Sequence, residues 1–431
     1  MMMIAETKDL KAMDIVDDKL GDSEEDTFDF EDSQQEMTCS PYANLKAKED
    51  CGMLYPAIEV GQILVEYSKI SKFKKHKEEM TIQDVAKELV LRFLPAKTLC
   101  RFRLVCKEWN HWITNPFLVH LHSFGFRDIS GLFCQSPRGK PHFISLNPRA
   151  YGVPSPTLSF LPEDVTIRAA SNGLLCCQSH NIDPAYYICN PATKEWKLLR
   201  KPTYYHGPKS VVALNFEPSM LNFKANFELI CAIPIPDNPV VYFEIYSSRS
   251  DSWRVADTEC WEPKALEFKG DGFLLKGVAF WETCSGAVLA FDLTDEQYGM
   301  LPTPPSSESS LGVLTEMHGE LCYILPHEKT DEPRIDVYGG WNLSLKYKIP
   351  LNSEVPDHIT GELRPLPCVN GDVLMVLLGT RLCACNVKEG KLKMINSNVL
   401  SSGAENLKFL PYVNSLTPVG HQYVESKDFY H

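Results

Sequence analysis

Residues 82–116 carry apolar side chains at the spacing of α-helices. Two rows with a spacing of four, Val85-Leu89-Phe93 and Ala86-Val90-Leu94, form one wide apolar face, and this pattern predicts a helix. Pro95 ends that helix, because proline lacks an N–H group and disfavours helical geometry in the residue before it.

Two more short helices are expected in the same stretch. The second covers residues 97–106, with one side formed by Leu99, Phe102 and Cys106. The third begins near Lys107 and continues until Pro116 breaks it. Three helices in about 40 residues make a unit too small to bury all of this apolar surface. We therefore expect the excess to face a partner.

After His122 the helical spacing disappears, and short strand-like runs separated by Gly, Pro, Asn and Asp take its place. A glycine turn followed by an apolar strand recurs at Gly131, Gly173, Gly277, Gly319 and Gly371. The gaps are 42, 104, 42 and 52 residues, and the strand FELICAI near Phe227 fills the middle of the gap of 104. Six repeating units result.

A second recurring element supports the same period. An alternating strand and a polar turn lead to an aromatic residue or leucine at Trp196, Trp253, Tyr298, Leu345 and Leu392. These positions are 57, 45, 47 and 47 residues apart, a mean of 49. A period of about 50 is typical of kelch-like blades, in which four strands pack against the next blade. The pattern predicts a kelch-like β-propeller, with six blades.

The fold class is therefore α plus all-β, and multidomain. We expect an acidic disordered tail over residues 1–52, a linker over 53–80 and a three-helix unit over 81–122. The propeller follows over 123–420, and a flexible C-terminus over 421–431. The linker holds a basic cluster near Lys74, which is either a nuclear address or, as we favour, a solvated linker.

Charge and hydropathy exclude some classes of protein. Residues 1–50 hold 15 acidic residues and five lysines, a net charge of −10, which leaves −3 of the total −13 for the other 381 residues. A nearly neutral body with an acidic tail disfavours nucleic-acid binding. The longest apolar runs, such as Val373–Leu378, are too short for a membrane helix, and the N-terminus lacks the pattern of a secretory signal.

The cysteines indicate reduced thiols and no metal centre. The chain has 15 cysteines, and the closest pairs, Cys176-Cys177 and Cys383-x-Cys385, lack the C-x-x-C spacing of zinc sites. No H-E-x-x-H, G-x-S-x-G, P-loop or dinucleotide glycine motif is present, so we expect no cofactor and no catalytic site. The densest acidic group, Asp292, Asp295 and Glu296, is interpreted as a solvated turn.

Residues 94–109, LPAKTLCRFRLVCKEW, resemble the plant-type F-box, whose central pattern is L-P-x-K-S-L-x-R-F-R-x-V-C-K-x-W. The family opens its first helix with Leu-Pro, where this chain has Ile82 and Gln83. Downstream, NPATKEW, NGLLCC and FEIYSSRSDSW resemble the F-box-associated, kelch-like region of the same proteins, over roughly residues 125–420.

This resemblance implies the substrate-recognition subunit of an SCF-type ubiquitin ligase, without catalysis of its own. The helices would bind a Skp1-type adaptor and, through it, cullin, while the propeller would bind a protein substrate. The adaptor contacts carried over from the family are Ile82, Val90, Leu91, Leu94, Pro95, Leu99, Val105, Cys106 and Trp109. The expected location is the cytoplasm, the nucleus or both.

The substrate-binding residues stay open at this point. Three loop groups on the propeller contain aromatic residues that could contact a partner or, as we favour, pack internally: Tyr204-Tyr205-His206, Trp261-Glu262 and Gly339-Gly340-Trp341. Two rival functions are a propeller enzyme or ligand sensor whose helices serve dimerisation, and an F-box scaffold that directs no ubiquitination.

Overall fold

The computed structural model describes residues 90–419. Within this range it leaves out residues 127–128, 138, 148–151, 182, 220–221, 236–237, 306–311, 328–333, 352–362, 369–370, 372, 388–391 and 397–406. The expected acidic tail, the linker, the C-terminus beyond residue 419 and the predicted helix up to residue 89 lie outside the described residues.

The helical unit, residues 90–126, contains one short 3₁₀ turn and three α-helices: η3 (Leu91–Phe93), α4 (Ala96–Phe102), α5 (Lys107–Ile113) and α6 (Pro116–Gly125). The chain is extended at Leu94, the residue before Pro95, as expected. The second predicted helix was too long, because α4 ends at Phe102. Cys106 precedes α5 and is exposed, so it does not share a face with Leu99.

The third predicted helix ends before Pro116, as expected, because α5 ends at Ile113, but a further helix that was not predicted begins at Pro116. Asn115 precedes α6 and its side-chain oxygen accepts a hydrogen bond from the N–H of Phe117 at 2.9 Å. Proline is well suited to the first position of a helix, where its missing N–H leaves no hydrogen bond unmade. The same residue therefore ends one helical run and starts α6, which extends to Gly125, beyond the predicted boundary at residue 122.

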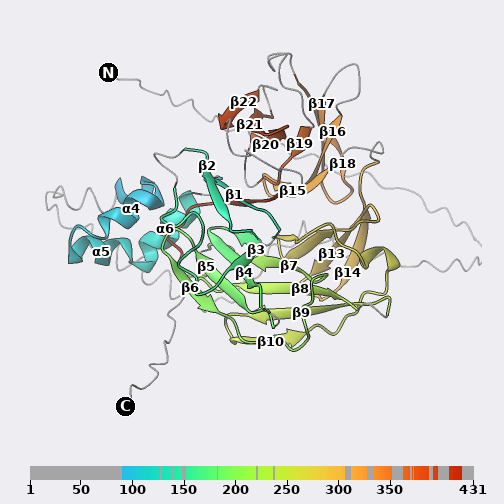
Figure 1. Cartoon of the computed structure of the whole chain (residues 1–431), viewed down its shortest axis with the longest axis horizontal. Coiled ribbons are helices and arrows are strands. Elements are labelled where there is room, and N and C mark those ends of the chain that lie inside the picture. The colour runs from blue at the N-terminus through green and yellow to red at the C-terminus, as the bar shows by residue number, and fades with distance from the viewer. Residues whose placement is uncertain are drawn as a thin grey trace, which may run out of the picture.

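The strands form six antiparallel sheets, as the two repeats predicted (Figure 1). Blade I has three strands: β23 (Lys408–Tyr412), β1 (Gly131–Gln135) and β2 (His142–Ser145). Blades II and III contain β3 (Val165–Ser171), β4 (Leu174–Ser179), β5 (Tyr186–Asn190), β6 (Glu195–Leu198), β7 (Val211–Asn215), β8 (Glu228–Pro234), β9 (Val241–Ser247) and β10 (Ser252–Val255).

Blade IV follows a short 3₁₀ turn, η4 (Pro263–Ala265). Blades IV and V contain β11 (Phe273–Leu275), β12 (Val278–Glu282), β13 (Ala287–Asp292), β14 (Tyr298–Pro302), β15 (Val313–Met317), β16 (Glu320–His327), β17 (Arg334–Gly339) and β18 (Ser344–Pro350). Blade VI contains β19 (Leu363–Pro365), β20 (Val373–Leu378), β21 (Arg381–Asn386) and β22 (Leu392–Asn396).

The ring is closed by β23, which pairs with β1 from Gly131 opposite Tyr412 to Gln135 opposite Lys408. Blade I thus combines strands from both ends of the propeller. Each junction between neighbouring blades holds its own apolar core, and there are six such cores among the described residues. The core between blades VI and I, for example, joins Met375 and Leu382 to Leu132 and Phe409. Packing at every junction shows that the ring is complete.

The glycine repeat arises from the turn between the first two strands of a blade. Asn172-Gly173, Lys276-Gly277 and His318-Gly319 all have positive φ at both residues. Two successive positive φ values define the type I′ turn that matches the twist of a two-residue hairpin. Glycine occupies the second position in each case because a left-handed backbone conformation costs it little. At three of its five positions the first sequence repeat is therefore a repeat of turn chemistry, whereas Gly131 is the first residue of β1.

The second repeat lies at the turn between the third and fourth strands. Lys194, Asp251, Glu296 and Leu343 have positive φ, and each stands two residues before a repeat position. At one of these, Trp253 packs its ring 5.8, 5.3 and 5.4 Å from the rings of Tyr186, His206 and Tyr246. The repeated aromatic residue therefore joins blade III to blade II.

The propeller has two rims. We define the near rim as the turns that connect the first strand of a blade to the second and the third strand to the fourth. The far rim consists of the loops that connect the second strand of a blade to the third and the loops that connect one blade to the next. The helical unit packs on the near rim: the Cys100 Sγ lies 3.5 Å from the Ala192 carbonyl oxygen, in the turn between β5 and β6. The ring of His120 on α6 lies 5.1 Å from that of Phe223, between β7 and β8.

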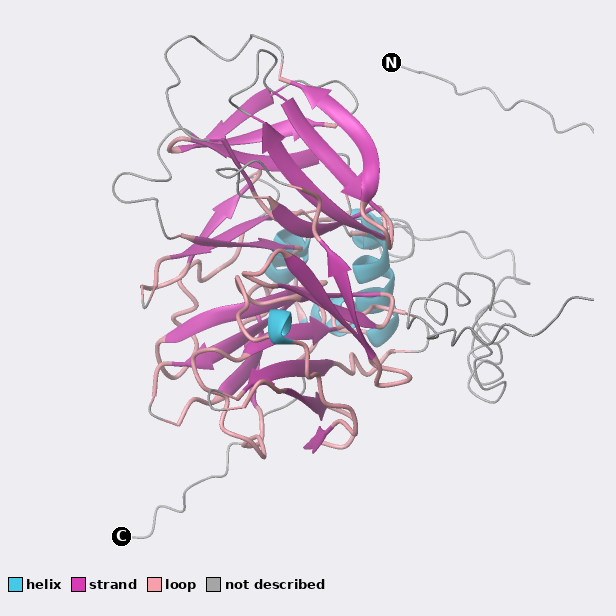
Figure 2. Ribbon diagram, turned by 90° about the vertical axis from the view of Figure 1, so that its right-hand side faces the viewer, coloured by secondary structure: helices cyan, strands magenta, loops and turns pink. Residues whose placement is uncertain are grey.

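The segment after β23 completes this contact. Leu416 belongs to the core of the helical unit, and the hydroxyls of Ser123 on α6 and Thr417 lie 3.2 Å apart. The side-chain amide of Asn190, in blade II, donates to the carbonyl oxygens of Ser415 and Thr417 at 3.1 and 2.8 Å. Figure 1 shows α4, α5 and α6 as a group at one side of the strands, and in Figure 2 this group lies behind the strands. The far rim is left uncovered by the helical unit.

Candidate functional site

The helical unit exposes large apolar side chains on the part that does not touch the propeller. Leu104 and Val105 are 87 % and 65 % exposed, Phe93 is 63 % exposed and Val90 is 44 % exposed. Single exposed apolar residues are common in proteins, but a group of them on one small unit indicates an interaction surface. We call these four residues the apolar helical surface.

The turn between α4 and α5 positions two of them. The N–H groups of Leu104 and Val105 donate to the carbonyl oxygens of Arg101 and Phe102, at 3.1 and 3.0 Å, so the backbone is fixed while both side chains project outward. Behind the turn, the Phe102 and Trp109 rings meet edge to face, with centroids 5.3 Å apart. The turn is therefore supported by aromatic packing and does not depend on a partner for its shape.

The nine residues expected to contact an adaptor occupy three kinds of position. Ile82 lies outside the described residues. Val90, Val105 and Cys106 are exposed, and Leu94, Pro95 and Trp109 are partly buried.

Leu91 and Leu99 are buried, with exposed fractions of 1 % and 0 %, among Ala96, Ile113 and Leu416. Their predicted place on a binding surface is therefore corrected: they hold the helices together from inside.

Two surface residues were missed. Phe93 was placed on the apolar face of the first predicted helix but was not among the expected adaptor contacts, and Leu104 occupies a position where the F-box pattern fixes no residue type. A signal was nevertheless available for Leu104, because it is a leucine at a position outside the apolar spacing of α4. An apolar residue that no internal face accounts for is a candidate for an intermolecular contact.

A buried histidine fixes the extended segment at Leu94. The Nε2 of His122, on α6, donates to the Leu94 carbonyl oxygen at 3.0 Å. Its Nδ1 is buried and has no hydrogen-bond partner among the described residues. Burial therefore lowers the pKa of His122 to about 4, although the bond to Leu94 acts in the opposite direction. The imidazole stays neutral at physiological pH.

We expect this histidine to make the stability of the chain depend on pH. Because its pKa is lower in the folded than in the unfolded state, protonation favours unfolding, and stability falls as pH drops from about 6.5 towards 4, by up to roughly 3 kcal/mol. His122→Gln keeps an N–H donor but does not titrate, so urea unfolding at pH 7 and pH 4.5 should differ less for this variant than for the wild type. His142→Gln, an exposed control, should keep the wild-type difference; equal pH dependence in all three proteins would contradict the assignment.

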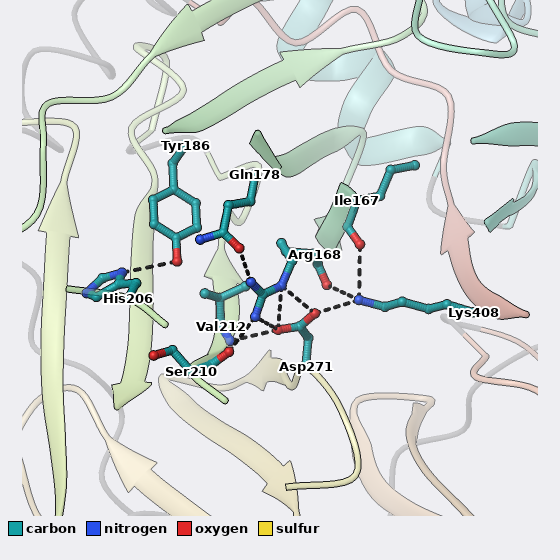
Figure 3. Close-up of polar contacts among 9 residues, drawn as sticks. All are labelled: Ile167, Arg168, Gln178, Tyr186, His206, Ser210, Val212, Asp271 and Lys408. Atoms are coloured by element: carbon teal, nitrogen blue, oxygen red, sulfur yellow. Dashed lines mark hydrogen bonds and ion pairs between the residues drawn. The ribbon is translucent and has the colours of Figure 1, made fainter. Parts of the chain in front are cut away.

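The inner strands of the propeller surround a cavity of about 330 Å³, lined by residues from all six blades. Three charged side chains, Arg168, Asp271 and Lys408, meet at its far-rim end (Figure 3). The Arg168 guanidinium donates from Nε to Asp271 Oδ2 at 2.9 Å and from Nη2 to Oδ1 at 2.8 Å, and the Lys408 ammonium lies 2.5 Å from Oδ2 as well. We call these three residues the inner ion cluster.

The inner ion cluster connects four blades. Asp271 precedes β11 in blade IV, Arg168 is on β3 in blade II and Lys408 begins β23 in blade I. Blade III joins through the N–H of Val212, which donates to Asp271 at 3.0 Å. Burial alone would raise the pKa of the Asp271 carboxyl, but the two cations beside it lower that pKa to about 2.

The cluster is saturated by its own contacts. The Lys408 ammonium also donates to the carbonyl oxygens of Ile167 and Arg168, both at 3.0 Å, which uses its third and last N–H. Arg168 further donates to the Gln178 side chain and the Ser210 carbonyl oxygen (Figure 3). Groups bonded in this way hold blades together and leave little for a ligand, so we assign the cluster a structural role.

The three aromatic loop groups are placed on different sides. Tyr204, Tyr205 and Trp261 are exposed on the far rim, while His206 is buried. Trp341 lies on the near rim and packs 5.7 Å from Phe280, so this group is part of the core between blades IV and V. Two of the three groups therefore remain candidates for partner contacts.

The acidic group in blade IV is less solvated than predicted. Asp292 is buried, and its Oδ1 accepts hydrogen bonds from the N–H groups of Thr294 and Asp295 at 2.7 and 3.4 Å. Glu296 forms an ion pair with Arg254. The expectation of a solvated turn was wrong for Asp292, whose carboxylate shapes the hairpin. No three His, Cys, Asp or Glu side chains in the described ranges are grouped as metal ligands.

Comparison with known proteins matches both parts of the chain. Residues 83–121 match the family model of the F-box domain, and residues 154–338 match that of the F-box associated beta propeller domain. The second match starts within the loop before blade II and ends in blade V, whereas the described propeller continues to β23 and includes β1. The helical unit is thus an F-box domain.

Three Arabidopsis thaliana proteins are among the similar sequences. F-box protein At5g07610 is 29 % identical over 63 % of this chain and 72 % of its own length. F-box protein At5g03970 is 24 % identical over 60 % of this chain and 67 % of its own length. F-box protein At5g49610 is 30 % identical over 38 % of this chain and 48 % of its own length. This chain belongs to the F-box proteins that carry an F-box-associated β-propeller.

Proposed function

We propose that this chain is the substrate receptor of an SCF-type ubiquitin ligase and has no catalytic site of its own. Its F-box binds a Skp1-type adaptor, which connects it to cullin, and its propeller binds a protein substrate. The apolar helical surface carries this proposal, because an F-box that presents Phe93, Leu104 and Val105 to solvent needs a partner to bury them.

The size of the surface suits a stable complex. Burial of a leucine, valine or phenylalanine side chain contributes roughly 1.5–3 kcal/mol before the costs of association. The four residues of the apolar helical surface therefore provide about 6–12 kcal/mol of gross stabilisation. Leu94, Pro95 and Trp109, which are partly exposed, would extend the contact.

The arrangement of the two domains fits the same role. The F-box occupies the near rim, so an adaptor bound to it leaves the far rim free for a substrate. None of the helices in the described ranges combines the length and the apolar character that crossing a lipid bilayer requires. All thirteen cysteines of the described ranges are free thiols, which is typical of the reducing cytoplasm and nucleus, where we place the protein.

Copurification tests the proposal. The full chain, tagged and mixed with a recombinant Skp1-type adaptor, should retain the adaptor in a complex that survives gel filtration. Addition of cullin and a ubiquitin-charged conjugating enzyme should then build ubiquitin chains on a bound substrate, whereas a pure scaffold would retain the adaptor without chain formation. A chain that retains no adaptor, beside a control F-box protein that does, would contradict the proposal.

A further inference from the structure

The far rim of blades II to IV carries several exposed aromatic side chains. Tyr205 and Trp261 are 66 % and 51 % exposed, and Tyr204 is also exposed. The Tyr204 ring stacks on that of Tyr242, at the start of β9, with centroids 5.5 Å apart. We call Tyr204, Tyr205, Tyr242 and Trp261 the far-rim aromatic patch.

Backbone pairing connects the two ends of this patch. Val241 and Cys260 exchange both backbone hydrogen bonds, at 2.9 and 3.0 Å. Residues paired in this way have Cα atoms about 5.5 Å apart. Tyr242 and Trp261 directly follow these two residues in sequence, so the loop from 199 to 210, the edge of β9 and the loop before η4 form one surface.

The loop that carries Tyr204 and Tyr205 is held in place by hydrogen bonds to buried side chains. The buried Glu244 carboxylate accepts hydrogen bonds from the N–H groups of Thr203 and Tyr204, at 2.6 and 3.1 Å. The same carboxylate contacts His206 Nε2 at 3.0 Å, and the other ring nitrogen of His206 lies 3.1 Å from the Tyr186 hydroxyl. The indole N–H of Trp253 donates to the Arg200 carbonyl oxygen at 2.6 Å, at the start of the loop.

This rigidity has a consequence for binding. Aromatic residues on an ordered loop lose little conformational entropy when a partner packs on them, so more of the contact energy remains as affinity. The buried Glu244 carboxylate fixes the backbone of a loop that exposes Tyr204 and Tyr205, as expected for a pre-organised binding surface. If the tyrosines served only to pack the loop against the propeller, their side chains would point inward.

The charges around the patch are unequal at its two ends. At the tyrosine end, Lys201 pairs with Asp183 and Lys209 pairs with Glu267. At the tryptophan end, three carboxylates form no ion pair with any described residue: Asp257, Glu259 and Glu262. The cations nearest to them in sequence are Lys264 and Arg254, and Arg254 is paired with Glu296. The patch therefore carries an excess of negative charge beside exposed aromatic faces.

We propose that the far-rim aromatic patch binds a protein segment rich in arginine and lysine. A guanidinium or ammonium group over the faces of Tyr205 and Trp261 gains a cation–π contact, and the free carboxylates of Glu259 and Glu262 attract the same group. The negative excess disfavours a nucleic-acid backbone, because its phosphates would be repelled. This inference rests on the proposed function, since it names the class of substrate segment that the receptor selects.

A peptide selection tests this inference on the full chain without adaptor. A library of random 12-residue peptides is selected on the immobilised chain, and the arginine and lysine content of the retained peptides is compared with that of the input. We expect at least a twofold enrichment of these residues and weaker retention at 500 mM than at 150 mM salt. Retained peptides with no basic enrichment, or an absence of retained peptides, would overturn the inference.

Variants assign the retention to the patch. Tyr205→Ala and Trp261→Ala should each lower retention of an enriched peptide at least tenfold, while Tyr205→Phe should keep it. Glu259→Lys combined with Glu262→Lys should abolish the basic enrichment. Matched controls are Tyr347→Ala, an exposed aromatic on β18, and Glu217→Lys on the near rim; equal losses in the controls would overturn the inference.

Adaptor retention is measured on the same variants. Because the patch and the apolar helical surface lie on opposite sides of the molecule, every far-rim variant should retain the adaptor as the wild type does. Failure of peptide selection with intact adaptor binding would refute the far-rim inference alone. Failure of adaptor binding in the wild type would refute the proposed function. The peptide selection would then still show whether the far-rim aromatic patch binds basic segments.

Discussion

Replacement of Asp271 with alanine is expected to lower the free energy of unfolding by about 3–5 kcal/mol. The substitution leaves the Arg168 guanidinium and the Lys408 ammonium without their counter-charge, in a cluster where the Asp271 side chain is only 7 % exposed. It also removes the acceptor for the Val212 N–H, so the contacts through which the cluster links four blades are lost (Figure 3). Urea unfolding followed by tryptophan fluorescence measures the loss.

Two further variants separate charge from space. Asp271→Asn keeps the shape of the side chain but not its charge, and we expect most of the same loss. The triple variant Asp271→Ala, Arg168→Met and Lys408→Met should regain much of it, because no buried charge remains uncompensated. Asp183→Ala, which breaks an exposed ion pair with Lys201, serves as the control and should cost less than about 1 kcal/mol. A small effect of Asp271→Ala would contradict the structural role of the cluster.

The double variant Leu104→Asp and Val105→Asp is expected to weaken adaptor binding at least about 100-fold. Each change removes apolar contact worth roughly 1.5–3 kcal/mol, and 1.4 kcal/mol corresponds to a factor of ten. A carboxylate brought into an apolar interface without a partner adds a desolvation cost. Because both side chains are exposed in the free chain, the melting temperature should change little. Titration of the adaptor, monitored by calorimetry, measures the loss.

The matched control makes the same change elsewhere. Leu345 and Tyr347 on β18 are also exposed and stand two residues apart, so Leu345→Asp with Tyr347→Asp alters an equal number of surface positions on the propeller. This control should bind the adaptor normally. Leu94→Asp is a poorer test, because the Leu94 side chain packs on the core of the F-box as well. Normal adaptor binding by the Leu104 and Val105 variant would show that the apolar helical surface serves another purpose.

The propeller could be predicted from sequence because its turns impose residue types. Gly173, Gly277 and Gly319 recur because a type I′ turn requires positive φ, and this requirement is local. The pairing of β23 with β1 left no such trace, since it joins distant segments through backbone hydrogen bonds that any residue can make. Helix α6 was missed because a proline is compatible with both the end and the start of a helix.

The functional residues were less predictable, for a physical reason. An apolar spacing shows that one face of a helix avoids water, but not whether its own chain or a partner covers that face. Both Leu99 and Val105 were expected at the interface, yet Leu99 is buried within the chain and Val105 is exposed. The inner ion cluster could not be predicted from the sequence, because Arg168 and Lys408 are separated by 240 positions and only the closed ring brings them together. The internal packing that we favoured for the aromatic loop groups was wrong for Tyr204, Tyr205 and Trp261, which are exposed.

The closure of the ring by β23 affects how the protein is made. Ser123 and Thr417, which meet where the F-box rests on the propeller, are 294 residues apart. At about 5–20 residues per second, a ribosome needs roughly 15–60 s to synthesise the intervening chain. During that time β1 has no partner on one edge, although every one of its residues is buried in the finished molecule. An unpaired apolar edge that persists for this long attracts other strands, so we expect the nascent chain to depend on chaperones until its last strand emerges.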